Sequence, residues 1–238
     1  MRKSKYLAVG GALALTIVMG GCAAEPAVES EPASAARDVD GDTLRGDVEY
    51  DYDIQRSMLG VVNASETAVT GRIASWAEGR QLRCGEMLYK RAVVEITTDT
   101  ILAGTGDPAS VFVEVHRGTV VVDADGVEVP LEKGSSYIDH SVQEMEAAAP
   151  VGTRVIVAAV NATPASDYET FSCKIVDEGE RPISAERLLG PIPQGFILEG
   201  ADGNHVSGVA DQYDVEWGEW PRGENTFQQI LDQLAATD

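Results

Sequence analysis

Apolar and polar residues alternate in several short segments of this chain, which is the period of a β-strand with one buried face. Residues 110–117 show it most clearly, because Val111, Val113 and Val115 alternate with polar or aromatic neighbours. Residues 154–160 are apolar after the first position, which is typical of a central strand. Further strands are predicted over 67–76, 89–102, 119–123, 127–129, 195–199 and 205–209. The pattern therefore predicts a mainly β protein.

One segment near the C-terminus has the period of an amphipathic helix. Four apolar residues are spaced i, i+3, i+4 and i+7, namely Phe227, Ile230, Leu231 and Leu234. Thr226 and Gln229 match a capping box at its start. A single helix after many strands is expected to pack across an open face or edge of the sheet. Residues 141–149 fit either a short helix or a loop.

The first 22 residues follow a third pattern. Three basic residues, Arg2, Lys3 and Lys5, precede an uncharged run over residues 6–19, and small residues follow. This order is typical of a secretory signal peptide, and the apolar run is shorter than the roughly 20 residues that a membrane span needs.

The end of this leader, Met19-Gly20-Gly21-Cys22, resembles the lipobox of bacterial lipoproteins, with Met19 in place of the usual leucine. The resemblance implies that residues 1–21 are removed and that the Cys22 thiol carries diacylglycerol. Such an anchor would hold the protein on the extracytoplasmic face of the cell membrane, since two or more acyl chains bind stably. An uncleaved anchor or plain secretion are the alternatives.

Residues 22–56 are predicted to be an acidic, disordered tether, because apolar residues are too sparse there to form a core. Within it, Asp38, Asp40, Asp42 and Glu49 have the spacing of calcium ligands in an EF-hand loop. Thr43 stands where that loop needs glycine and no flanking helices are predicted, so the solvated tether is the favoured interpretation.

Charge excludes some partners. The whole chain has a net charge of −21, and removal of residues 1–21 would leave 15 of the 18 basic side chains against all 39 acidic ones, or −24. Nucleic acid is excluded as a partner, because it binds basic surfaces. An anionic bilayer would likewise repel the folded part.

Three cysteines are present, and lipid on Cys22 would leave Cys84 and Cys173. Outside the cytoplasm a disulfide between these two is expected, although two separate thiols would also fit. The bridge would close a loop of about 90 residues and stabilise the domain by about 4–5 kcal/mol.

Six or more short strands with turn signals between them predict a small β-barrel or sandwich. The segments TGRI, VVEI, VFVEV, PVGTRVIVAAV and PQGFILE, with the final FxxIL helix, resemble a group of uncharacterised lipoproteins of high-GC Gram-positive bacteria. The resemblance covers roughly residues 57–236, implies an OB-like barrel and carries over no catalytic residues. Residues 57–238 are accordingly predicted to form one β-rich extracytoplasmic domain.

Candidate chemistry is sparse. The three histidines, His116, His140 and His205, have no metal-ligand spacing, and His116 is interpreted as a surface residue at a strand end. No nucleophile, P-loop or cofactor motif occurs. Aromatic residues Tyr213, Trp217 and Trp220 stand among carboxylates, where they would pack in the core, contact a partner, or bind a sugar or a cation.

The sequence therefore favours a non-enzymatic lipoprotein that acts as a binding or interaction module, with no cofactor. Its expected partners are the membrane through Cys22 and either an envelope protein or a small ligand. The alternative is a ligand-binding or sensory lipoprotein that uses the Trp217/Trp220 region. A pocket with convergent polar groups would favour ligand binding or an enzyme, whereas a filled barrel with an apolar surface patch would favour the interaction module.

Overall fold

A computed structural model describes residues 38–45, 55, 57–105, 108–130, 137–162, 172–180, 188–209 and 226–236. All of these residues belong to one compact unit. Tyr213, Trp217, Trp220, Cys22 and Glu49 lie outside the described residues.

Five strands close into a barrel, in the order β1–β2–β3–β6–β4 and back to β1. Their bounds are Thr67–Cys84 for β1, Met87–Ala103 for β2, Ser110–Val121 for β3, Arg154–Asn161 for β4 and Leu188–Glu199 for β6. Neighbours are antiparallel except β3 and β6, which run parallel. The predicted mainly β, OB-like barrel with a C-terminal helix is thus confirmed.

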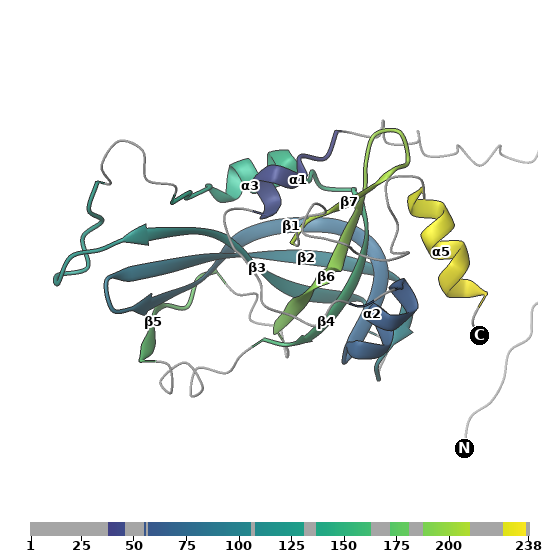
Figure 1. Ribbon diagram of the computed structural model, residues 1–238, viewed down its shortest axis with the longest axis horizontal. Coiled ribbons are helices and arrows are strands. Elements are labelled where there is room, and N and C mark those ends of the chain that lie inside the picture. Colours follow the sequence, from purple (N-terminus) through teal and green to yellow (C-terminus); the bar gives the residue numbers. More distant parts are fainter. Residues whose placement is uncertain are drawn as a thin grey trace, which may run out of the picture. The chain divides into compact units, whose positions relative to one another are not determined.

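Strands β1 and β2 are long, and their turn extends well beyond the barrel (Figure 1). The first part of β1, from Thr67 to Arg72, pairs with β4, whereas its last part, from Gln81 to Cys84, pairs with β5 (Cys173–Asp177). One long strand therefore serves both the barrel and a separate extension. A short strand, β7 (His205–Ser207), pairs with the end of β6.

The predicted disulfide between Cys84 and Cys173 is confirmed. The two cysteines are direct partners across β1 and β5, with Cα atoms 4.2 Å apart. The bridge fastens β5 to the extension formed by β1 and β2.

The barrel interior is filled by small and branched apolar side chains that alternate along the strands. On β3 these are Val111, Val113 and Val115, and on β4 they are Val155, Val157 and Ala159. The opposite face of β4 belongs to a second cluster, to which Ile156 and Ala158 contribute. β4 is therefore buried on both faces, as its unbroken apolar run predicts.

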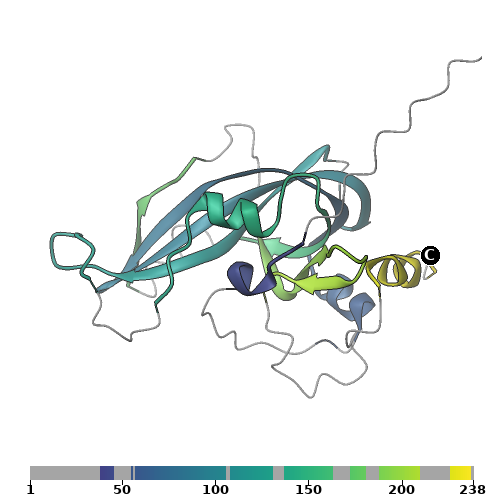
Figure 2. The same cartoon turned by 90° about the horizontal axis from the view of Figure 1, so that it is seen from above.

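Two helices cover that second cluster, α2 (Met58–Ala64) and α5 (Phe227–Ala235). The predicted stripe of α5 is confirmed, since Phe227, Ile230 and Leu234 are buried in it. Figure 2 shows α5 at the end of the barrel away from the β1–β2 turn. Arg154 of β4 lies over the Phe227 ring, 5.1 Å from its centroid, and helps to seat the helix.

A third helix, α3 (Val142–Ala148), lies beside the barrel (Figure 1). Of the two predicted alternatives for residues 141–149, the structure has the helix, over Val142–Ala148. Ser141 and Glu144 form a capping box at its start. Met145 and Val142 anchor the helix in the barrel core.

Residues 38–45 differ from the predicted tether. They form α1 (Gly41–Arg45), whose Leu44 is buried in the barrel core together with Val39. The Asp40 amide donates to Ala148 O of α3 at 2.9 Å, and Arg45 Nη1 donates to Ser207 O at 2.8 Å. The prediction of a free tether is wrong for this part, because two buried apolar side chains and an arginine bonded to the buried Ser207 carbonyl are enough to dock one helical turn.

Candidate ligand-binding site

The parallel contact between β3 and β6 is the weakest closure of the barrel. It consists of two residue pairs, Phe112 with Leu188 and Val113 with Leu189. Beyond them β6 continues with Gly190 and Pro191, and a proline has no N–H to extend a ladder. The two strands therefore separate at this point, which we call the seam.

A cavity of about 260 Å³ lies at the seam. Its polar lining comprises Arg91, Glu114, His116 and Asn161. Its apolar lining comprises Val115, Val160, Ala162, Gly190, Pro191 and Val209. Two of these residues, Val115 and Val209, also belong to the barrel core, so the cavity reaches the core through the gap between the strands.

The register of β3 explains why polar groups gather here. Its core residues alternate with Glu114 and His116, which therefore point to the opposite face of the sheet. Arg91 of β2 is the direct cross-strand partner of His116. Cross-strand partners on one face lie about 5 Å apart, so Arg91 and His116 share the cavity wall.

Glu114 forms a buried ion pair with Arg80 of β1. Arg80 Nε donates to Glu114 Oε1 at 2.7 Å, and a second guanidinium N–H donates to Oε2. The side chains are 4% and 5% exposed. The β1–β2 register shifts between Glu78 and Gln81, and such an irregularity turns a side chain toward a new neighbour. The pair removes the net charge that Glu114 would otherwise bring to the cavity.

His116 is held neutral. Burial, followed by the positive charges of Arg91 and Arg117, lowers the pKa of its imidazole from 6.5 to about 3. Its Nε2 lies 3.3 Å from the Thr119 hydroxyl oxygen. The prediction that His116 is a surface residue is wrong, because it is only 6% exposed.

Arg91 is the remaining charged group of the wall. It is partly buried, and its Nε is shielded from solvent without a hydrogen-bond partner. Within the described part of the chain no ion pair neutralises Arg91. Asn161 is oriented from the other side, since its Nδ2 donates to Glu66 Oε2 at 2.8 Å. Among the described residues, the cavity thus combines one cation without an ion-pair partner, oriented polar groups and an apolar wall.

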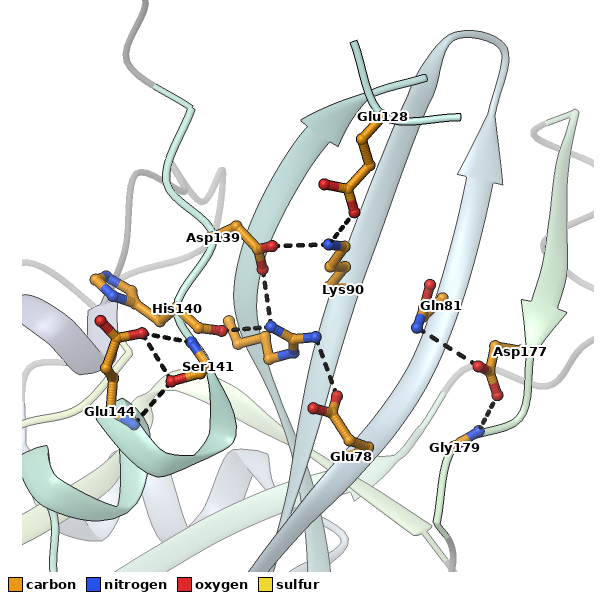
Figure 3. A network of polar contacts seen from close by, with 11 residues as sticks. Glu78, Gln81, Lys90, Glu128, Asp139, His140, Ser141, Glu144, Asp177 and Gly179 are labelled. Carbon is orange, nitrogen blue, oxygen red and sulfur yellow. Dashed lines mark hydrogen bonds and ion pairs between the residues drawn. The ribbon is translucent and has the colours of Figure 1, made fainter. Parts of the chain in front are cut away.

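Figure 3 shows a second polar network on the same strands. Its residues Lys90 and Arg117 alternate with Arg91 and His116, so they lie on the opposite face of the sheet. Lys90 of β2 and Arg117 of β3 both bond to Asp139, at 2.7 and 2.8 Å. Lys90 also pairs with Glu128, and Arg117 with Glu78 at 3.0 Å. Burial tends to lower the pKa of Lys90, but its bonds to the two carboxylates outweigh that and raise it. Every cation here is matched by carboxylates, so this network serves to hold the segment before α3 against the sheet.

Two of the predicted calcium ligands are occupied by the protein itself. Asp40 accepts hydrogen bonds from the Asp42 and Thr43 amides and from the Thr43 hydroxyl, which lowers its pKa. Asp42 forms an ion pair with Arg45. Asp38 is exposed beside them. In the described ranges no group of three or more His, Cys, Asp or Glu side chains could hold a metal ion.

Among the polar cavity residues, the sequence points only to His116, as one of three histidines without metal-ligand spacing. Glu114 is a charged residue between valines, and nothing local marks it as buried. Its burial depends on Arg80, which is 34 positions away and reaches it only through an irregular register.

Comparisons with protein-family models, with curated proteins and with solved structures find no match to this chain. Among the helices that the structure describes, none is long and apolar enough to cross a membrane.

Proposed function

We propose that this protein is a non-enzymatic binding module that takes a small polar ligand into the seam cavity. The observation that carries the proposal is the convergence of Arg91, Glu114, His116 and Asn161 on a preformed hollow with an apolar wall. Ligand sites are typically concave and apolar, with a few polar groups that orient the ligand. A cavity of this kind favours ligand binding over an interaction module that uses only its outer surface.

The chemistry of the lining favours binding over catalysis. A general acid or base works best with a pKa near the working pH, whereas the pKa of His116 is about 3. The carboxylate of Glu114 is held by two bonds from Arg80. These groups are arranged to donate and accept hydrogen bonds rather than to move protons at neutral pH.

We place this module on the extracytoplasmic face of the cell membrane, anchored by lipid on Cys22. The lipobox-like end of the leader carries this part of the proposal. The bridge between Cys84 and Cys173 supports it, since disulfides persist in oxidising compartments.

The test uses the mature chain in calorimetric titrations with amino acids, hydroxy acids, sugars and polyamines as probes. Gly190→Ile is the blocking variant, because Gly190 lines the cavity and a Cβ there would lie 3.8 Å from the Ala162 Cα, its nearest neighbour. A probe that binds the mature chain but not Gly190→Ile supports the proposal, provided that the variant melts within a few degrees of the parent.

Two outcomes would contradict it. The first is that no probe class binds. The second is that binding survives Gly190→Ile but is lost when Trp217 and Trp220 are replaced by alanine, which would move the site to the alternative region.

A further inference from the structure

We infer that the ligand of the seam cavity is a small aliphatic monocarboxylate with a hydrogen-bond donor on its α-carbon, that is, an α-amino or α-hydroxy acid. The inference rests on the proposed function and adds the chemical class of the ligand. It follows from three features of the wall: its cation without an ion-pair partner among the described residues, the acceptor beside that cation, and its apolar side.

Arg91 is the cation of the described lining without an ion-pair partner, and it calls for a carboxylate group on the ligand. Arg80 and Glu114 cancel one another, and His116 is neutral. Arg91 remains, with no ion-pair partner among the described residues and with a buried Nε that lacks an acceptor. A carboxylate matches a guanidinium well, since the two planar groups form paired N–H···O bonds.

The position of Glu114 calls for a donor beside that carboxylate. Arg91 faces His116 in the register, and Glu114 lies two residues along the same strand and on the same face. Such diagonal neighbours are roughly 7–8 Å apart at their Cα atoms, within reach of long side chains. Each carboxylate oxygen has two lone-pair sites, and Arg80 is seen to use one on each oxygen. A ligand carboxylate on Arg91 would therefore place an α-ammonium or α-hydroxyl group within reach of Glu114.

The remaining wall calls for an aliphatic tail. Val115, Val160, Pro191 and Val209 present carbon atoms to the cavity. Its volume of about 260 Å³ is smaller than the roughly 300–1,000 Å³ of sites for drug-sized ligands. A branched side chain of four or five carbon atoms would suit such a space.

Other small ligands fit the wall less well. A phosphate dianion would have one cation to neutralise it and would lie beside the Glu114 carboxylate. A polyamine would meet Arg91 with like charge. A neutral sugar would leave Arg91 without a counter-charge.

The experiment compares closely matched probes by calorimetry on the mature chain. L-Leucine and 2-hydroxy-4-methylpentanoate carry the proposed features, whereas 2-hydroxy-4-methylpentanamide has the same shape without the charge. Inorganic phosphate serves as the competing anion. We expect at least one of the two acids to bind, and the amide to bind at least tenfold more weakly than the hydroxy acid. Tighter binding of leucine would identify the donor as an ammonium group.

Arg91→Gln is expected to weaken binding of the acids at least tenfold with a melting temperature close to that of the parent. Arg72→Gln is the matched control, because Arg72 is an exposed arginine on β1 that is absent from the cavity lining. It should leave binding unchanged.

The inference is overturned if the amide binds as well as the acid, if phosphate binds more tightly than either acid, or if Arg91→Gln has no effect. In those cases the proposed function stands as long as Gly190→Ile abolishes binding of whichever probe is bound. If no probe of any class binds, the proposed function fails and this inference fails with it.

Discussion

At the scale of single residues, His116 links the cavity to the stability of the fold. Charged or titratable side chains approach it from β2 and β3, namely Arg91, Arg117, Glu114 and Tyr89. Burial and the two arginines favour the neutral imidazole, so the folded protein resists a proton that the unfolded chain accepts.

This gives a pH dependence with a definite sign. The pKa of His116 is about 3 in the folded state against an ordinary value of 6.5, so its contribution to stability is complete above pH 6.5 and is lost as the pH falls toward 3. The loss is at most about 1.4 kcal/mol per pH unit. Urea unfolding between about pH 7.5 and 5 should show this decline in the parent and a weaker one in His116→Gln, since most carboxylates stay ionised there. Equal slopes in both proteins would contradict the prediction.

The Arg80–Glu114 pair yields a second prediction. Glu114→Leu removes the carboxylate from a buried guanidinium and is expected to lower the free energy of unfolding by about 3–5 kcal/mol. The double variant Arg80→Met/Glu114→Leu should recover most of that loss, because no charge is left buried at this position. Urea unfolding of the two single variants and the double variant measures the coupling directly. Additive losses would show that the two side chains act independently.

At the scale of elements, β5 depends on one covalent bond. It pairs with β1 over Gln81–Cys84, and the bridge to Cys84 joins residues 89 positions apart. Replacing both Cys84 and Cys173 with serine is expected to cost about 4–5 kcal/mol in the loop-entropy model. For a chain of this size that corresponds to a melting temperature lower by roughly 10 °C. Calorimetry measures the shift, and limited proteolysis should cut first near 172–180. An unchanged melting temperature would mean that the strand pairing alone holds β5.

The strands show how far a pattern of residues can predict this fold. Alternation was sufficient to predict β3, because a strand with one buried face alternates apolar and polar residues. The unbroken apolar run was sufficient to predict β4, because both faces of that strand are buried. The sequence predicts only the second half of β6, residues 195–199. Pro191 and Pro193 in the first half are typical of a loop, but the barrel accepts them at the seam, where the strand has few ladder bonds to make. The short helices α1 and α2 were missed as well, because one or two turns have too few positions to show a period.

The cavity could not be predicted from local patterns. Its lining comes from β2, β3, β4 and β6 and from the segment after β7, and only the closed barrel brings these together. Glu114 and Arg91 do not differ locally from other charged residues of long strands. Whether a charge is paired depends on tertiary contacts that local spacing does not contain.

At the scale of the whole molecule, the charge bears on the proposed lipid anchor. Removal of residues 1–21 would leave a chain with a net charge of −24, which has no attraction of its own to an anionic membrane. Attachment would therefore depend on lipid at Cys22.

In a bacterial host, the full-length protein is expected to fractionate with membranes and to be released by detergent. Cys22→Ser should move it to the soluble fraction, because the modified thiol is removed. Membrane fractionation and mass spectrometry of the N-terminal peptide test this. Membrane association that persists in Cys22→Ser would indicate another means of attachment.

The two residue pairs of the seam also bear on the order in which this chain can fold. Phe112 and Val113 pair with a strand that begins only at Leu188. Arg45 bonds to the carbonyl of Ser207, 162 positions later. Contacts so distant in sequence make folding slow, since long loops must close before any stabilisation is gained. The barrel can therefore close only after β6 has been made, so the seam cavity is among the last parts of the fold that can form.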